Sequence, residues 1–152
     1  VLERSDIDRI ARLGVIASVQ PAFLGSEFEW IVDRVGADRM VSTYPFASLD
    51  YAGVPMGGGS DSPVESPDPW AGMALARDRA GVMHAEGLLP DRALALFTDG
   101  AAIALGEPLP LAPTSPADVI VVDRDPVTID PEELRKTVVY ETWVRGERVD
   151  LS

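Results

Sequence analysis

Hydrophobic positions in the first third of the chain predict an alternation of helices with one short strand. Apolar residues at helical spacing predict a helix capped by Ser5 and ended by Gly14. The β-branched run 15–19 follows directly and predicts a buried strand. A weaker helical pattern covers residues 45–51 and stops before Gly53.

A further helix is expected between the first strand and residue 45. Ser26 is followed three residues later by Glu29, which is the capping-box pattern of a helix start. Apolar residues then recur at helical spacing up to Gly36. These signals predict one continuous helix over residues 26–36.

The segment 54–59 carries one proline and three glycines and is a poor strand by itself, because glycine loses entropy and offers no side chain to pack. Where such a run is a strand, we expect another group to approach its backbone closely. Asp68 and Pro69 then predict the start of a helix. Pro90 predicts another, with a break at Gly100.

The pattern changes after Gly106, where prolines make a stiff connection with little helix. Beyond it, residues 119–122 and 137–144 are strand-like, and Arg145-Gly146 predicts a hairpin turn into 147–149. We therefore divide the chain into residues 1–106, with βα alternation and a parallel sheet, and residues 107–152, which are β-rich. Two parallel strands cannot bury both faces or close a barrel. Since residue 1 is also not methionine, we expect a piece of a longer chain.

Composition narrows the class of protein. The chain has 152 residues, of which 46% are hydrophobic and 25% charged, as in globular domains. Its net charge of −12 disfavours nucleic acid and anionic membranes as partners. No apolar run reaches the roughly 20 residues that cross a bilayer. The sequence contains no cysteine, which fits a reducing cytoplasm and excludes thiolate metal sites.

Candidate chemistry gathers after the glycine run. Asp61 stands between Ser60 and Ser62, and such a cluster is most often only a turn. A carboxylate at the carboxyl end of a parallel strand, however, occupies the place where α/β barrels put their active sites. There it can bind a metal or accept a proton from water. Trp70 lies close enough in sequence to line a substrate pocket together with both serines.

Several segments, taken in order and spacing, resemble the amidohydrolase superfamily, in the branch that contains N-substituted formamide deformylase. The most specific is Gly59-Ser60-Asp61-Ser62-Pro63-Val64 followed by Asp68-Pro69. The others are 13–21, Tyr44 to Leu49, 52–54, Thr98 with 101–102, and 117–123. The resemblance covers essentially the whole chain.

The resemblance implies the C-terminal part of a (β/α)8 TIM-type barrel, namely strands 7 and 8 with their helices, plus the C-terminal strands of a small β-sandwich. It implies one or two divalent metals, with zinc expected. Asp61 matches the metal-site aspartate of the eighth strand, whereas His84 matches no ligand position. Many relatives carry a histidine where this chain has Phe23, which removes a polar substrate contact.

The leading hypothesis is therefore a fragment of a metal-dependent hydrolase that cleaves amide, formamide or cyclic amide C–N bonds, with Asp61 as general base. A zinc site needs about three protein ligands, so we expect the fragment to be inactive alone. Its expected partners are a small-molecule substrate, the missing N-terminal part of the same protein and a second copy in a homo-oligomer. The alternative is a non-catalytic α/β binding or interaction module on the same scaffold.

Overall fold

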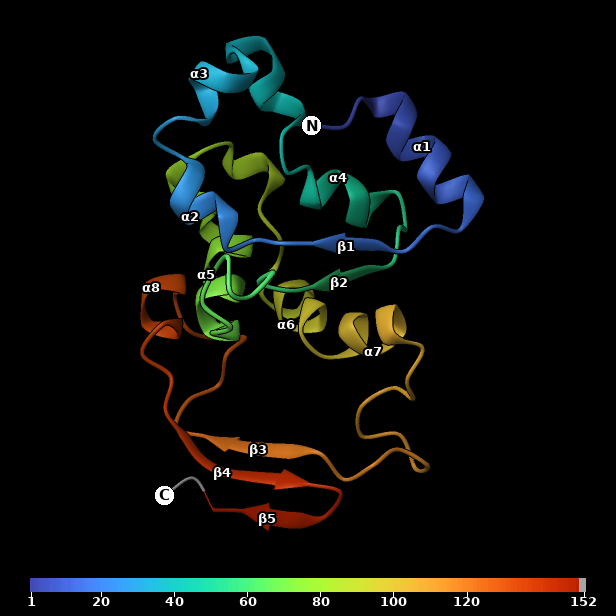
Figure 1. Cartoon of the computed structure of the whole chain (residues 1–152), viewed down its shortest axis with the longest axis vertical. Helices are drawn as coiled ribbons and strands as arrows, with labels where there is room; N and C mark the ends of the chain where they lie inside the picture. Colours follow the sequence, from blue (N-terminus) through green and yellow to red (C-terminus); the bar gives the residue numbers. More distant parts are fainter. Residues whose placement is uncertain (151–152) are drawn as a thin grey trace.

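The computed structural model describes residues 1–150 and contains two separate sheets (Figure 1). Up to residue 105 the elements are α1 (Arg4–Leu13), β1 (Ala17–Val19), α2 (Phe23–Glu27), α3 (Ile31–Val35), η1 (Ala37–Ser42), α4 (Phe46–Tyr51), β2 (Met56–Gly58), α5 (Pro69–Asp78), η2 (Arg79–Gly81), η3 (His84–Glu86), α6 (Pro90–Leu96) and α7 (Asp99–Leu105). Then follow β3 (Val119–Val122), α8 (Pro131–Leu134), β4 (Val139–Val144) and β5 (Glu147–Val149).

β1 and β2 form a parallel pair in the middle of the molecule (Figure 1). Ala17 is in register with Met56, and Val19 is in register with Gly58. The parallel arrangement confirms the prediction from the βα alternation. β1 is shorter than the predicted strand 15–19. Val15 and Ile16 are exposed and precede the strand, which begins at Ala17. The two strands end side by side, so whatever follows them shares one edge of the sheet.

Helix α7 crosses β2 at a distance that only glycine permits. A Cβ atom added to Gly57 would lie 2.8 Å from the Ala104 Cβ atom and 2.9 Å from the Gly100 carbonyl oxygen. A Cβ atom on Gly100 would lie 2.0 Å from the Met56 carbonyl oxygen. The glycine run is therefore a strand with a closely packed backbone, as predicted, and the approaching group is a helix of the same chain.

Two predicted details of the N-terminal helices are wrong. Helix α1 is capped by Glu3 in a capping box with Asp6, so Ser5 lies inside the helix. The Ser26 hydroxyl donates to the Phe23 carbonyl oxygen within α2, at 3.2 Å, and caps nothing. The predicted helix 26–36 is instead two short helices, because the chain bends after α2.

This bend lets both short helices contribute to the core. Leu24 on α2 and Ile31 on α3 are 2% and 4% exposed, respectively. Burial of both side chains outweighs the local preference for one straight helix, as tertiary packing commonly does. The predicted break at Gly100 is also displaced: the chain turns at Phe97 and Thr98, and Gly100 lies inside α7.

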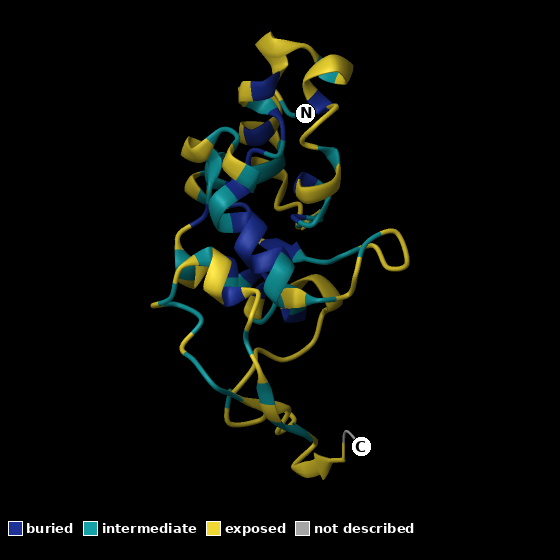
Figure 2. Cartoon of the chain, turned by 90° about the vertical axis from the view of Figure 1, so that its left-hand side faces the viewer, coloured by how far each residue is buried: buried dark blue, intermediate teal, exposed yellow. Residues whose placement is uncertain are grey.

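The C-terminal strands form a three-stranded antiparallel sheet in the order β3-β4-β5. Arg145 and Gly146, with φ of 53° and 78°, make the predicted tight turn between β4 and β5. Figure 2 shows that burial is concentrated in the helical part, while this sheet is exposed or half-buried.

The short helix α8 returns from the C-terminal sheet to α5 and was not predicted (Figure 1). Leu134 on α8 is 1% exposed and packs against Met73 and Ala74 of α5. The Arg77 guanidinium donates to the carbonyl oxygens of Pro126 and Ile129, at 3.4 and 2.7 Å. The C-terminal segment is thus attached to the helical part by packing and hydrogen bonds.

Most of the buried apolar side chains belong to one cluster around β2, α4, α5 and α6. The buried members of this cluster are Ile7, Leu24, Phe46, Leu49, Val54, Met56, Leu75, Ala76, Leu88, Ala93 and Leu96. Within residues 1–150 there is no helix with the length and apolar character that crossing a bilayer requires.

The close packing of β2 against α7 can be tested with two alanine variants in the same glycine run. Gly57→Ala places a methyl group against backbone and should lower the free energy of unfolding by about 1–3 kcal/mol. Gly59→Ala meets no atom within 4 Å and should leave it unchanged or raise it by up to about 1 kcal/mol. Urea unfolding followed by circular dichroism measures both, and equal effects would contradict the packing described.

Candidate functional site

The carboxyl ends of β1 and β2 form one edge of the sheet, on the side of α2 and α5 (Figure 1). The backbone amide of Gly59 donates to the Val19 carbonyl oxygen at 2.9 Å, which extends the pairing one residue beyond β2. Ser60 and Asp61 follow at once. The predicted site residues therefore begin where the parallel pair ends.

Asp61 has a left-handed backbone with φ of 57° and is exposed. Its turn is closed by other groups: the Ser62 amide donates to the Ser60 hydroxyl at 3.2 Å, and the Val64 amide donates to the Asp61 carbonyl oxygen at 2.9 Å. Among residues 1–150, no hydrogen bond or ion pair involves the Asp61 carboxylate. The turn does not need this carboxylate, which leaves it free to act on a ligand.

Ser60 and Ser62 flank Asp61, and the Ser60 hydroxyl is already used as an acceptor in the turn. Trp70 lies in the first turn of α5, and its amide donates to the Asp68 carboxylate at 2.9 Å, as the predicted cap requires. Its half-buried ring packs with Met73 and the C-terminal segment. A substrate-binding role for these three residues stays a prediction.

Metal binding requires several ligands, and the described part of the chain does not bring enough of them together around Asp61. No group of three or more histidine, cysteine, aspartate or glutamate side chains within residues 1–150 could hold a metal ion. His84 is exposed in η3. Asp61 can therefore supply one ligand of a metal site, but the described residues do not supply a complete set of ligands.

Helix α2, which follows β1, is held by a hydrogen bond from Tyr44, a residue for which the sequence predicted no such contact. The Tyr44 hydroxyl donates to the Glu27 carboxylate of α2 at 2.5 Å. Burial raises the pKa of Tyr44 well above its usual value, and the hydrogen bond and the negative charge of Glu27 raise it further. Tyr44 thus stays protonated, and its hydrogen bond ties the end of α2 to the segment before α4. The 17-residue separation gives no local signal for this pair.

The backbone beside Tyr44 is held from the other side by Arg79, which is 1% exposed. Its guanidinium donates to the carbonyl oxygens of Thr43, Tyr44 and Val82, at 3.1, 2.7 and 3.1 Å. Burial lowers the pKa of Arg79, partly offset by the charge of Glu86. Hydrogen bonds to three carbonyl groups compensate the buried cation.

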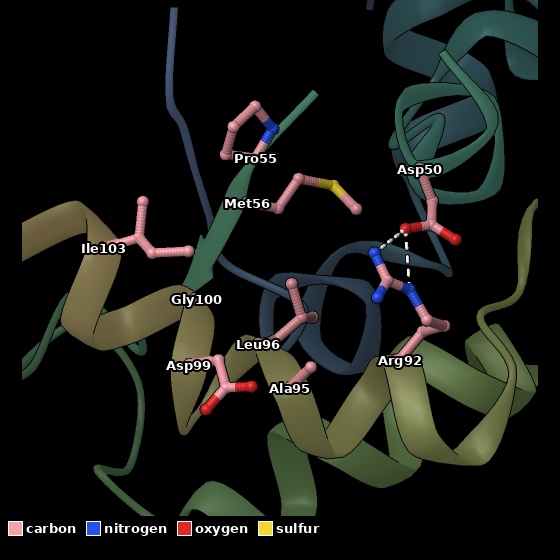
Figure 3. A pocket seen from close by; sticks show the side chains of 9 residues that line it. All are labelled: Asp50, Pro55, Met56, Arg92, Ala95, Leu96, Asp99, Gly100 and Ile103. Carbon is pink, nitrogen blue, oxygen red and sulfur yellow. Dashed lines mark hydrogen bonds and ion pairs between the residues drawn. The ribbon is translucent and has the colours of Figure 1, made fainter. Parts of the chain in front are cut away.

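A cavity of about 200 Å³ lies at the opposite end of β2, where Pro55 and Met56 line it (Figure 3). At its edge the Arg92 guanidinium donates to one Asp50 oxygen at 2.8 and 2.5 Å. Because β2 runs away from this cavity toward Asp61, the cavity is separate from the candidate site.

The unusual backbone of Asp61 allows a test of whether the residue serves stability. Asparagine tolerates the left-handed conformation as aspartate does, so Asp61→Asn should leave the free energy of unfolding unchanged within about 0.5 kcal/mol. Asp61→Ala should lower it by at most about 1 kcal/mol, because alanine adopts the left-handed conformation several-fold less often than aspartate or asparagine does. Thermal unfolding measures both, with Glu65→Ala as a control on the same loop. A large loss in Asp61→Asn would show that the carboxylate stabilises the fold.

A model described as "Amidohydrolase family" matches residues 1–150. The chain is 31% identical over 160 residues to the protein named "Putative amidohydrolase YtcJ" from Bacillus subtilis (strain 168). The match covers 98% of this chain and 30% of that protein.

Two solved structures of uncharacterized metal-dependent hydrolases are also similar. The one from Pyrococcus furiosus is 35% identical with a TM-score of 0.77, covering 84% of this chain and 27% of the other. The one from Pyrococcus horikoshii OT3 is 32% identical with a TM-score of 0.78, covering 87% and 29%. The chain therefore spans less than a third of the length of these relatives.

Proposed function

This chain belongs to the amidohydrolase family, and from that premise we propose that it is part of a metal-dependent enzyme that hydrolyses carbon–nitrogen bonds other than peptide bonds. The observation that carries the proposal is the exposed Asp61 carboxylate, which has no partner within residues 1–150 and follows the parallel strand β2 directly. The proposed substrates are amides, formamides or cyclic amides, as for the N-substituted formamide deformylase branch that the sequence resembles.

In the proposed reaction the Asp61 carboxylate is the general base. It accepts a proton from the attacking water while the new carbon–oxygen bond forms, and it passes the proton to the leaving nitrogen as the carbon–nitrogen bond breaks. Asp61 would also be one ligand of a divalent metal, for which we propose zinc, and this metal would act as a Lewis acid that makes water a stronger acid and nucleophile. Ser60, Ser62 and Trp70 are the proposed substrate contacts.

The remaining metal ligands would come from the part of the relatives' length that this chain does not span. We assign β1 and β2 to strands 7 and 8 of a TIM-type barrel, and β3 to β5 to a β-sandwich. The similarity to two metal-dependent hydrolases at TM-scores of 0.77 and 0.78 supports this assignment. The same protein's other strands, a small-molecule substrate and a second copy are the proposed partners. The cytoplasm stays the compartment predicted from the sequence.

The role of Asp61 is tested by Asp61→Asn in a protein that carries these residues together with the other strands. Asparagine keeps the size and the left-handed backbone but cannot accept the proton. We expect kcat/KM to fall by about 10²–10⁴-fold, the usual contribution of a general base. Amine or carboxylate release from formanilide, acetanilide and succinimide measures it. Glu65→Gln removes the same charge from the same loop and should change little. A loss of less than about tenfold would contradict the role of Asp61 as base.

Metal content distinguishes the enzyme from a non-catalytic binding module. After dialysis against zinc and then buffer, we expect the 152-residue chain to retain far less than one zinc ion per molecule, since one carboxylate is too few ligands. The longer protein should retain at least one ion, and Asp61→Asn should lower that content. Elemental analysis by plasma mass spectrometry measures all three. A stoichiometric ion in the short chain would contradict the incomplete site.

A further inference from the structure

The aromatic ring of Phe97 lies at a point where β2 and α5 both lack side chains. A Cβ atom added to Gly58, the last residue of β2, would lie 3.1 Å from the Phe97 Cζ atom. A Cβ atom added to Gly72 of α5 would lie 2.5 Å from the same atom. The tip of one ring therefore occupies the space left by two missing side chains.

These two glycines stand at the two ends of the segment that carries Asp61. Residues 59–68 connect β2 to α5, with Gly58 just before the segment and Gly72 in the first turns of α5. Phe97 itself ends α6, where the chain turns toward α7. We call residues 59–68 the Asp61 loop. Because Phe97 lies on a third element, its ring acts as a spacer between the two ends of this loop.

The ring is also supported from behind. Phe97 packs against both buried clusters, the large one that contains Met56 and Leu96 and the smaller one that contains Met73 and Leu134. Closely packed protein interiors transmit small displacements instead of absorbing them. A change in the ring would therefore move the elements that touch it.

We propose that Phe97 is a positioning residue: it sets the separation between the end of β2 and the start of α5, and thereby the backbone of the Asp61 loop. The effect on activity rests on the proposed role of Asp61 as base. A misplacement of about 1 Å is enough to cost roughly 10²-fold in rate. Phe97 does not touch the reacting atoms, so its influence is on geometry alone.

The test has two readouts, of which only one depends on catalysis. The first is amide hydrogen exchange of residues 59–68, measured by NMR in the 152-residue chain. The second is kcat and KM with formanilide, measured in the longer protein described above. Phe97→Leu removes the ring tip but keeps an apolar side chain, and Phe97→Met is a second, milder variant.

We expect both variants to speed exchange of the hydrogen-bonded amides of Gly59 and Val64 in the Asp61 loop by about tenfold or more, while exchange in α1 follows overall stability. We expect kcat to fall by roughly 10–100-fold with KM nearly unchanged. Leu49→Val on α4 is the control for lost core packing, and it should not change exchange in the loop selectively. Unchanged exchange in the loop of both Phe97 variants would overturn the inference.

A double-variant cycle tests the contact itself. Gly72→Ala alone places a methyl group against the Phe97 ring tip and should lower both stability and kcat. In the Phe97→Leu background the space is open, so the same substitution should be tolerated and should recover part of kcat. Additive losses would overturn the inference. Faster loop exchange with unchanged kcat would support the positioning of the loop by Phe97 and contradict the role of Asp61 as base.

Discussion

The backbone contact between β2 and α7 is the constraint on which the rest of this part of the molecule depends. Gly57 and Gly100 let a strand and a helix meet where any side chain would collide with main-chain atoms. Since α6 and α7 are joined directly, this contact also fixes the end of α6, where Phe97 lies. The same contact thereby positions the end of β2. Through Phe97, it also positions the loop after β2 and the start of α5.

The candidate site combines a hydrogen-bonded turn with a carboxylate that takes no part in the hydrogen bonds of that turn. Gly59 continues the pairing to Val19, and the Ser60 hydroxyl closes the turn, so the backbone at Asp61 is defined by its neighbours. The carboxylate contributes to none of these bonds within residues 1–150. Membership of the amidohydrolase family suggests a chemical role for this free carboxylate, which its local geometry alone does not suggest.

Local signals in the sequence were sufficient for elements whose ends are set by nearby residues. Asp68 and Pro69 gave the start of α5, and Arg145-Gly146 gave the hairpin. The parallel pair, the tightly packed glycine strand and Asp61 at its end were also predictable. The bend between α2 and α3 was not, because it accompanies the burial of Ile31 and of Leu24, which belongs to a core cluster of residues distant in sequence. Contacts such as Tyr44 with Glu27 have no periodic pattern that could predict them.

The attachment of the C-terminal segment to α5 has a consequence for how the sequence can vary. Arg77 recognises main-chain carbonyl oxygens at Pro126 and Ile129, and main-chain atoms are the same whatever side chain a position carries. Of the anchoring contacts, those of Ile129 and Leu134 depend on side-chain shape. The side chain at position 126 can therefore vary while the hydrogen bond from Arg77 to its carbonyl oxygen persists. Arg77, Ile129 and Leu134 are the positions at which substitution would be restricted.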